Sequence, residues 1–223
     1  MDHEFDADYW EQHWQRVAAR APGEQLPAHP QLGAEVRGLT PGTALEAGCG
    51  EGAEARWLAA HGWRVTAADV SAEVLGRAAA HEGSADVDWV QADLGTWTPT
   101  QPFDLVTTFY AHPEMPQLDF YRRLAGWVAP GGTLLLVGHA HGHTSGHGHT
   151  SGHEHGGHGH GEADAGEHPP EKATVTAAGT AAALDPDVWD VVTAVELART
   201  AGGGGRGPVR LTDVVVRAIR RPA

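Results

Sequence analysis

The sequence predicts an α/β fold built around a mostly parallel β-sheet. From Thr43 onward, short runs of β-branched and apolar residues alternate with helical segments, and this alternation is typical of parallel strand–helix–strand units. The first predicted strand ends in the glycine-rich sequence GCGEG, which suits a ligand site at the end of a parallel strand. Near the C-terminus, two β-rich segments flank the sequence AGGGGRG and predict an antiparallel hairpin at the edge of the sheet.

The N-terminal segment is predicted to be helical. Over residues 6–20, the spacing of Trp10, Trp14 and Val17 places these three side chains on one helical face. We interpret this face as core packing, with a lid over a pocket as the alternative. After a loop rich in proline and glycine, residues 31–38 predict a second, short helix.

Five strands with helices between them are predicted in the central part of the chain. The strands are Thr43–Ala47, Trp63–Asp69, Val87–Gln91, Phe103–Phe109 and Thr133–Gly138. The helices are Ala53–His61, a helix capped by Ser71, and Leu118–Val128, which is closed by Pro130, Gly131 and Gly132.

The composition changes abruptly after the fifth strand. Residues 139–168 contain ten of the sixteen histidines, interleaved with Gly, Ser and Thr, and such a segment cannot form a packed core. Structure is predicted to resume with a helix over Glu171–Leu184. The hairpin strands Val188–Leu197 and Val209–Ile219 follow it.

These elements predict a single domain over residues 1–223, a length that suits one α/β domain with an elaboration. The predicted parts are an N-terminal helical lid at 1–42, a ligand-binding core at 43–138, a His-rich low-complexity insertion at 139–170, and a C-terminal helix and β-hairpin at 171–223.

Charge and cysteine content narrow the range of partners. The chain has 15 basic and 29 acidic residues, a net charge of -14, so a nucleic acid is a poor partner because an acidic surface repels phosphates. Cys49 is the single cysteine, which excludes an intramolecular disulfide and fits a reducing compartment.

The N-terminus lacks the apolar stretch of a signal peptide, and no apolar run approaches the ~20 residues that span a bilayer. We expect a cytoplasmic protein without a membrane partner; its oligomeric state stays open.

The sequence LEAGCGEG at residues 45–52 carries the strongest functional signal. Glycines at the end of a strand allow a tight turn and close approach of a ligand to a helix N-terminus. Gly48, Gly50 and Ala53 also satisfy the G-x-G-x-x-G/A pattern of nicotinamide cofactor sites. However, Glu46 suits the cationic amino group of S-adenosylmethionine (SAM) and opposes a diphosphate. SAM is therefore favoured, and a nicotinamide-dependent reductase is the less favoured alternative.

Two further acids follow the next two strands. Asp69 ends the second strand, 23 residues after Glu46, at the position that binds ribose hydroxyls in either cofactor class. Asp93 follows the third strand in the sequence VQADL, where it can accept a hydrogen bond from an adenine amino group. Both positions are consistent with a nucleoside-containing cofactor.

The ordered motifs LEAGCGEG, VTAADVS, VQADL, FDLVTTFY and PGGTLLLVG resemble those of the class I SAM-dependent methyltransferases. The early sequence FDADYWEQHW is similar to the aromatic helix of their small-molecule branch, and within it to tellurite-resistance and thiopurine methyltransferases. The resemblance implies a Rossmann-like three-layer sandwich with seven strands in the order 3-2-1-4-5-7-6, strand 7 antiparallel.

The same resemblance implies a set of cofactor-binding residues in the core segment. Near the methionine and ribose of SAM it places Glu46, Gly48, Gly50 and Phe109. Around the ribose and the adenine it places Asp69, Val70, Asp93 and Leu94.

The residues after the fourth strand are candidates for catalysis. His112 and Tyr110 are expected to lie over the methyl group and to act as general base or to position the acceptor. His139 is the next candidate, and the alternative for His112 is simple packing against Pro113. The segment does not match the N/D-P-P-Y/F motif of adenine and glutamine methyltransferases, which favours another small-molecule acceptor.

The His-rich segment has the ligand type of a nickel or zinc site, but its spacing is not that of a structural zinc site. The candidate ligands are His141, His143, His147, His149, His153, His155, His158 and His160. We favour weak, adventitious affinity for nickel or zinc. The alternative is a metal-binding or metal-buffering protein on a methyltransferase scaffold.

Overall fold

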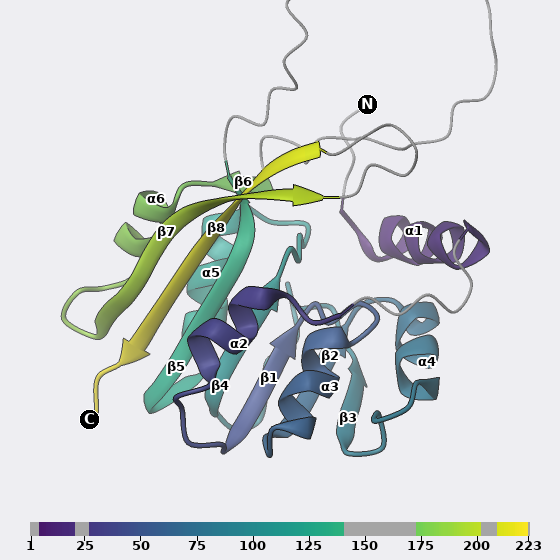
Figure 1. The fold of residues 1–223 in the computed structure, drawn as a ribbon, viewed down its shortest axis with the longest axis horizontal. Helices are drawn as coiled ribbons and strands as arrows, with labels where there is room; N and C mark the ends of the chain where they lie inside the picture. Colours follow the sequence, from purple (N-terminus) through teal and green to yellow (C-terminus); the bar gives the residue numbers. More distant parts are fainter. Residues whose placement is uncertain (1–4, 21–26, 141–172, 202–208, 223) are drawn as a thin grey trace, which may run out of the picture.

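The computed structural model describes residues 5–20, 27–140, 173–201 and 209–222 of the chain. The helices are α1 (Ala7–Arg20), α2 (Pro30–Val36), α3 (Ala53–Ala60), α4 (Ala72–Ala80), α5 (Gln117–Ala125) and α6 (Ala177–Ala182). The strands are β1 (Thr43–Ala47), β2 (Arg64–Asp69), β3 (Val87–Gln91), β4 (Phe103–Phe109), β5 (Val128–Ala140), β6 (Thr174–Val175), β7 (Trp189–Ala201) and β8 (Val209–Arg220). Figure 1 shows their arrangement.

One sheet organises the described part of the chain, in the order β3-β2-β1-β4-β5-β8-β7. Strands β1 to β5 pair in parallel, whereas β8 pairs antiparallel with both β5 and β7. The predicted order 3-2-1-4-5-7-6 is confirmed for these seven strands. The eighth strand, β6, was not predicted: its two residues pair in parallel with the end of β5.

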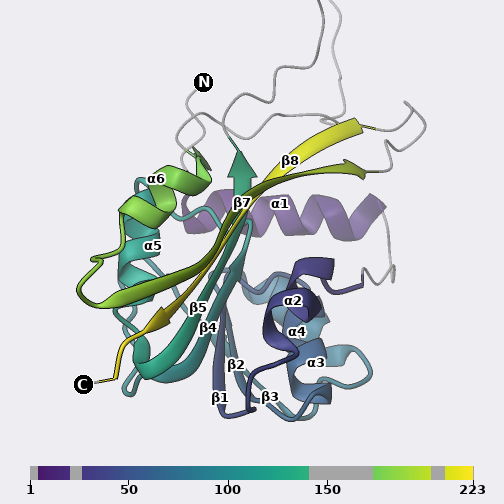
Figure 2. The same cartoon turned by 60° about the vertical axis from the view of Figure 1, so that its left-hand side comes forward.

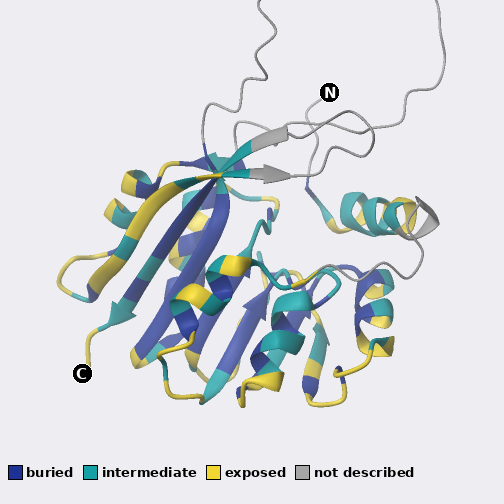
Figure 3. Cartoon of the chain, viewed as in Figure 1, coloured by how far each residue is buried: buried dark blue, intermediate teal, exposed yellow. Residues whose placement is uncertain are grey.

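The sheet carries a hydrophobic core on each face, as a three-layer sandwich requires. On one face, Phe120 and Leu124 of α5 pack with alternate residues of the strands, and α6 contributes Ala177. On the other face, α2 and α3 contribute Leu32 and Leu58, and α4 also packs there. In Figure 3 the central strands are accordingly almost entirely buried.

Two predicted helices differ from the structure. Helix α5 ends at Ala125, with Gly126 as its C-cap, and Val128 already pairs with Phe103 in the sheet. The Pro-Gly-Gly turn therefore interrupts the start of β5 rather than closing the helix.

The predicted helix at 171–184 is also shorter. Thr174–Val175 forms β6, as suits β-branched residues, and α6 begins only after Thr176. The side chain of Thr176 caps α6 by accepting a hydrogen bond from the Gly179 N–H. Residues 171 and 172 lie outside the described part of the chain.

The predicted hairpin is confirmed, and both of its strands are longer than predicted. Residues Val209–Thr212 of β8 lie beyond the last pair with β5 and pair with β7 alone. Strand β7 also contains a bulge at Val192, between the pairs made by Val191 and Thr193. The hairpin therefore extends past the carboxyl end of β5, where Figure 1 shows it above the sheet.

Helix α1 lies apart from both cores. It runs across the carboxyl ends of the parallel strands, as Figures 1 and 2 show. The side chains of Trp10, Trp14 and Val17 line the cavity beneath the helix and belong to neither core cluster. This arrangement matches the lid alternative rather than core packing.

Candidate active site

The site is built on the glycine turn that follows β1. Gly48, Gly50 and Gly52 adopt positive φ angles of 75°, 48° and 73°, which glycine reaches without steric cost. The N–H of Gly48 donates to the Ala68 carbonyl at 2.8 Å, so the turn is bound to the end of β2. At Gly52, a Cβ atom would lie 2.3 Å from the indole of Trp89. The turn therefore needs glycine for its conformation and for its packing.

Two carboxyl groups lie under this turn. Glu46 is 1% exposed and accepts a hydrogen bond from the Thr107 hydroxyl. Its pKa is raised well above the usual value, mainly by burial and further by Glu54. Asp69 accepts hydrogen bonds from the N–H groups of Gly50 at 2.9 Å and Ser71 at 3.0 Å, and burial raises its pKa too. Asp69 thus joins the ends of β1 and β2, and the site holds two buried acids.

The third predicted acid has a different environment. Asp93 is exposed and accepts hydrogen bonds from the Gly95 N–H at 2.8 Å and the Thr96 hydroxyl at 2.9 Å. These bonds shape the turn after β3. Leu94, which follows, is buried and lines the same cavity.

All eight residues predicted to bind the cofactor line one cavity of about 950 Å³. It extends from the glycine turn, past Val70 and Leu94, to the end of β4 at Phe109. Tyr110 and His112, the two catalytic candidates, line it as well. The structure therefore brings together residues that lie up to 66 positions apart in the sequence, from Glu46 to His112.

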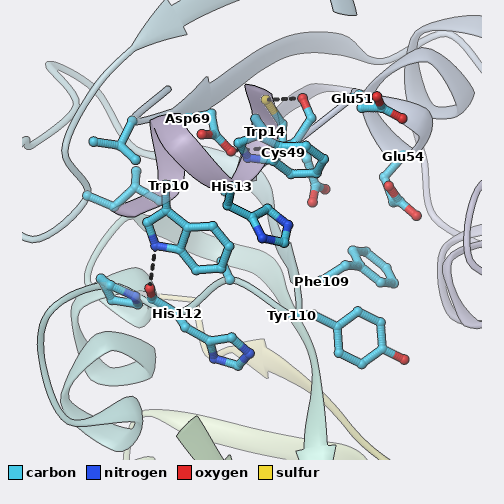
Figure 4. Close-up of a pocket in the computed structure, with 18 of the residues that line it drawn as sticks. Trp10, His13, Trp14, Cys49, Glu51, Glu54, Asp69, Phe109, Tyr110 and His112 are labelled. Atoms are coloured by element: carbon cyan, nitrogen blue, oxygen red, sulfur yellow. Dashed lines mark hydrogen bonds between the residues drawn. The ribbon is translucent and has the colours of Figure 1, made fainter. Parts of the chain in front are cut away.

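Helix α1 forms the opposite wall. In Figure 4, Trp10, His13 and Trp14 lie on one side of the cavity, and Phe109 and Tyr110 lie on the other. The indole N–H of Trp10 donates to the His112 carbonyl at 3.1 Å. At the other end, the Arg77 guanidinium donates to the Trp14 carbonyl at 3.2 Å. The helix is thus fixed to both sides of the crevice.

His112 has an ordered environment. It is 8% exposed, and its Nδ1 lies 3.0 Å from Oε1 of Gln117. The amide nitrogen of Gln117 donates to the Ala111 carbonyl at 3.0 Å, which orients Oε1 toward the imidazole. The ring Nε2 is buried and has no hydrogen-bond partner among the described residues. Burial lowers the pKa of His112, although the bond to Gln117 opposes this.

Tyr110 adopts a strained backbone conformation. Among the non-glycine residues of the described chain, Tyr110 alone has a positive φ, 55°. Strained backbone of this kind is concentrated at functional sites. The hydroxyl lies 3.1 Å from Nε2 of His29. Burial, and then the charge of Asp213, raise the pKa of this phenol, so it stays protonated at neutral pH. The ring of His139, the third candidate, lies tilted against Tyr110 at 4.6 Å and stacks on His112 at 5.4 Å between ring centroids.

The sequence reasoning missed the contribution of the hairpin. Arg199 of β7 lines the cavity, and its Nε donates to Asp213 of β8 at 2.7 Å. His29, just before α2, also contacts this carboxylate, at 3.4 Å. Asp213 was a detectable signal, because it is an acid inside the apolar strand LTDVVV.

The metal candidates cannot be placed. His141, His143, His147, His149, His153, His155, His158 and His160 all lie outside the described residues. Within the described ranges, no group of three or more His, Cys, Asp or Glu side chains is arranged to hold a metal ion. In those same ranges, no helix has the length and apolar character needed to cross a bilayer.

Comparison with known families decides between the two cofactor classes that the sequence left open. Residues 44–132 match the model of a methyltransferase domain family. This segment is therefore similar to a methyltransferase domain. It contains β1 apart from Thr43, all of β2 to β4, and every residue predicted to bind SAM. The alternative of a nicotinamide-dependent reductase is therefore set aside.

A protein named as a methyltransferase is similar to part of this chain. Trans-aconitate 2-methyltransferase of Streptomyces avermitilis is 39% identical over 105 residues, which cover 42% of this chain and 38% of that protein. The match thus spans well under half of either chain.

Solved structures resemble nearly the whole chain in fold. The N-methyltransferase NodS from Bradyrhizobium japonicum, in complex with S-adenosyl-L-homocysteine (SAH), aligns with a TM-score of 0.63 at 17% identity and covers 96% of this chain and 98% of that one. TehB from Haemophilus influenzae aligns with a TM-score of 0.62 at 13% identity, over 96% and 66% of the two chains. At these identities the likeness shows the fold alone. The predicted relationship to the tellurite-resistance methyltransferases therefore stays a prediction.

Proposed function

We propose that this chain binds SAM in the cavity under α1 and transfers its methyl group to a small-molecule acceptor. The observation that carries the proposal is the pair of buried acids, Glu46 and Asp69, beneath the glycine turn of a methyltransferase domain. A carboxylate at this point attracts the ammonium group of methionine and repels a diphosphate. The cavity of about 950 Å³ leaves room for an acceptor beside the cofactor.

The chain offers a separate group for each part of the cofactor. Glu46, with Gly48 and Gly50, would hold the methionine end. Asp69 would bind the ribose through the lone pairs that its two backbone hydrogen bonds leave free. Val70, Asp93 and Leu94 would surround the adenine, and Phe109 would border the sulfonium.

We assign the role of proton acceptor to His112. Because Oε1 of Gln117 can only accept, Nδ1 of His112 must carry the hydrogen. The lone pair then lies on Nε2, the ring atom that has no partner in the described structure. The lowered pKa keeps the imidazole neutral, and therefore basic, at neutral pH.

SAM supplies an already activated methyl group, so the protein has to position the acceptor and remove its proton. As the acceptor O–C or N–C bond forms, the C–S bond breaks and its electron pair passes to sulfur. The acceptor proton passes to Nε2 of His112. Tyr110 stays protonated because of its raised pKa, so we propose that it positions the acceptor.

The lid role predicted for the N-terminal segment fits this mechanism. Trp10 and Trp14 cover the crevice, and excluding water strengthens the electrostatic contacts inside it.

Calorimetry tests the cofactor first. We expect SAM and SAH to bind and NADH not to bind; the reverse result would contradict the proposal.

Release of SAH then tests the acceptor, over thiols, phenols, amines, chalcogen oxyanions and trans-aconitate, which the name of the Streptomyces relative suggests. Gln117→Leu is a matched variant, because it keeps the size of the side chain and removes the acceptor for Nδ1. We expect it to lower turnover while the SAM dissociation constant stays unchanged. Equal turnover in the variant would remove the tautomer argument.

A further inference from the structure

The cavity contains a group that methyl transfer itself does not require. Beyond the methionine end, the β7–β8 hairpin brings the Arg199 guanidinium against the ring of Tyr110, 5.5 Å from its centroid. Tyr110 lies two residues before His112, the proposed proton acceptor. Arg199 therefore borders the part of the cavity where the acceptor would lie, away from the adenine end.

Arg199 is held by a buried carboxylate. Asp213 is 2% exposed and binds Nε of Arg199 at 2.7 Å. Burial alone would raise the pKa of Asp213, but hydrogen bonds from His29 and Tyr110, together with Arg199, outweigh it and lower that pKa. Asp213 is therefore ionised at neutral pH, and it fixes the orientation of the guanidinium.

The ion pair is polarised toward the cavity. The Arg199 side chain is 35% exposed, whereas that of Asp213 is 3% exposed, so the cationic end reaches the cavity and the anionic end stays inside the protein. Nε donates a hydrogen bond to Asp213, and the guanidinium also has a hydrogen bond with the Tyr110 side chain. A guanidinium carries five N–H donors, so donors remain beyond these two bonds. A planar guanidinium whose Nε is held in place can bind a carboxylate through two parallel hydrogen bonds.

We propose that Arg199 binds a carboxylate of the methyl acceptor, so that the acceptor is an acid that also bears the O–H or N–H group to be methylated. This inference rests on the proposed function. A monoanion fits better than a phosphate monoester, because the charge of Arg199 is already shared with Asp213. His29 and Tyr110 support the subsite by adding contacts to Asp213.

Matched pairs of small molecules test this proposal on the full-length protein saturated with SAH. The probes are the three hydroxybenzoates, the α-hydroxy acid mandelate and the amino acid phenylalanine, each paired with its amide, together with phenyl phosphate. We expect at least one acid to bind at least tenfold more tightly than its amide, and phenyl phosphate to bind no better than that acid. With SAM in place of SAH, the same acid should yield SAH faster than its amide.

Three variants complete the experiment. Arg199→Gln should abolish the preference for the acid, and Arg199→Lys should retain part of it because it keeps the charge without the fork. The control is Arg221→Gln, which also removes one positive charge but from an exposed surface pair with Asp190. The control should keep the full preference.

Several results would overturn the inference while leaving the proposed function intact, because binding of SAH is measured on the same samples. In the unmodified protein, these results are amides that bind as tightly as the acids, or no acid that binds the SAH complex. In a folded Arg199→Gln variant, the contradicting result is a preference for the acid that persists. A further one is a tenfold loss of SAH affinity in that variant, which would assign Arg199 to the cofactor carboxylate instead. Failure of SAH to bind the unmodified protein would instead contradict the proposed function.

Discussion

Replacing Glu46 by glutamine should make the ligand-free protein more stable and SAM binding weaker. The carboxyl group of Glu46 is 1% exposed, and its pKa is raised, first by burial and then by Glu54. An acid whose pKa is raised by folding contributes stability below its unfolded pKa and loses it as the pH rises toward the folded pKa. At pH 8 the ligand-free protein therefore carries the cost of a buried carboxyl group.

The size of both effects follows from the contacts. Glutamine has the same shape and can still bond to Thr107, but it has no charge to desolvate, so the free energy of unfolding at pH 8 should rise by roughly 1–3 kcal/mol. For a chain of this size that corresponds to a melting temperature higher by roughly 2–12 °C. Loss of the charge-assisted hydrogen bond to the methionine ammonium should weaken the binding free energy of SAM by about 1.5–3 kcal/mol. This corresponds to a dissociation constant higher by roughly 10- to 150-fold.

The assay is thermal unfolding of the ligand-free protein at pH 5.5 and pH 8, followed by calorimetry with SAM at pH 8. The gain in melting temperature should be larger at pH 8 than at pH 5.5. Glu82→Gln is the control, because Glu82 is exposed and its loss should change neither quantity. A Glu46→Gln protein that is less stable at pH 8, or that binds SAM as tightly as the unmodified protein, would refute the reasoning.

Three other changes test the remaining parts of the site. Asp69→Ala should weaken SAM binding by roughly 1.5–3 kcal/mol in calorimetry, and an unchanged dissociation constant in a folded variant would remove the ribose assignment. His112→Gln should lower turnover by about 10²- to 10⁴-fold without changing SAM affinity. In the unmodified enzyme, the lowered pKa of His112 should keep turnover constant at neutral pH and reduce it only below the usual histidine range, which a pH–rate profile measures. Gly52→Ala should destabilise the protein by several kcal/mol in denaturant unfolding, through its positive φ and the contact with Trp89. Gly83→Ala, with a φ of 82° and no neighbour within 4 Å, should cost only the conformational part, and equal losses in the two variants would exclude the contact as a cause.

The half of the cavity that we propose holds the cofactor could be predicted from the sequence because its determinants are local. Glycines after β1 and acids at the ends of β1 and β2 occupy fixed places relative to their strands, and parallel pairing brings these strand ends together. Knowledge of the strands was enough to group Glu46 with Asp69. The α5 boundary was missed because the Pro-Gly-Gly sequence has the same composition whether it ends a helix or interrupts a strand.

The half of the cavity that we propose for the acceptor depends on contacts between distant segments, which local patterns do not encode. His29 lies next to a short helix, whereas Asp213 lies in the last strand, and the 3.4 Å contact between them joins positions 184 residues apart. The environment of His112 depends on the orientation of the Gln117 amide, five residues later. The sequence could name His112 as a candidate, but the free lone pair required the structure.

The bulge at Val192 reverses which face of the sheet the later side chains of β7 occupy. Side chains of a regular strand alternate between its two faces, so strict alternation from Trp189 would place every odd-numbered residue of β7 on the α5–α6 side, where Trp189 packs. After the extra residue, Thr193 instead bonds to Glu35 of α2, on the opposite side, and Arg199 follows the same phase into the cavity. One inserted residue, seven positions upstream, thus turns Arg199 toward the cavity, and the spacing between Trp189 and Arg199 decides on which face of the sheet the cation lies.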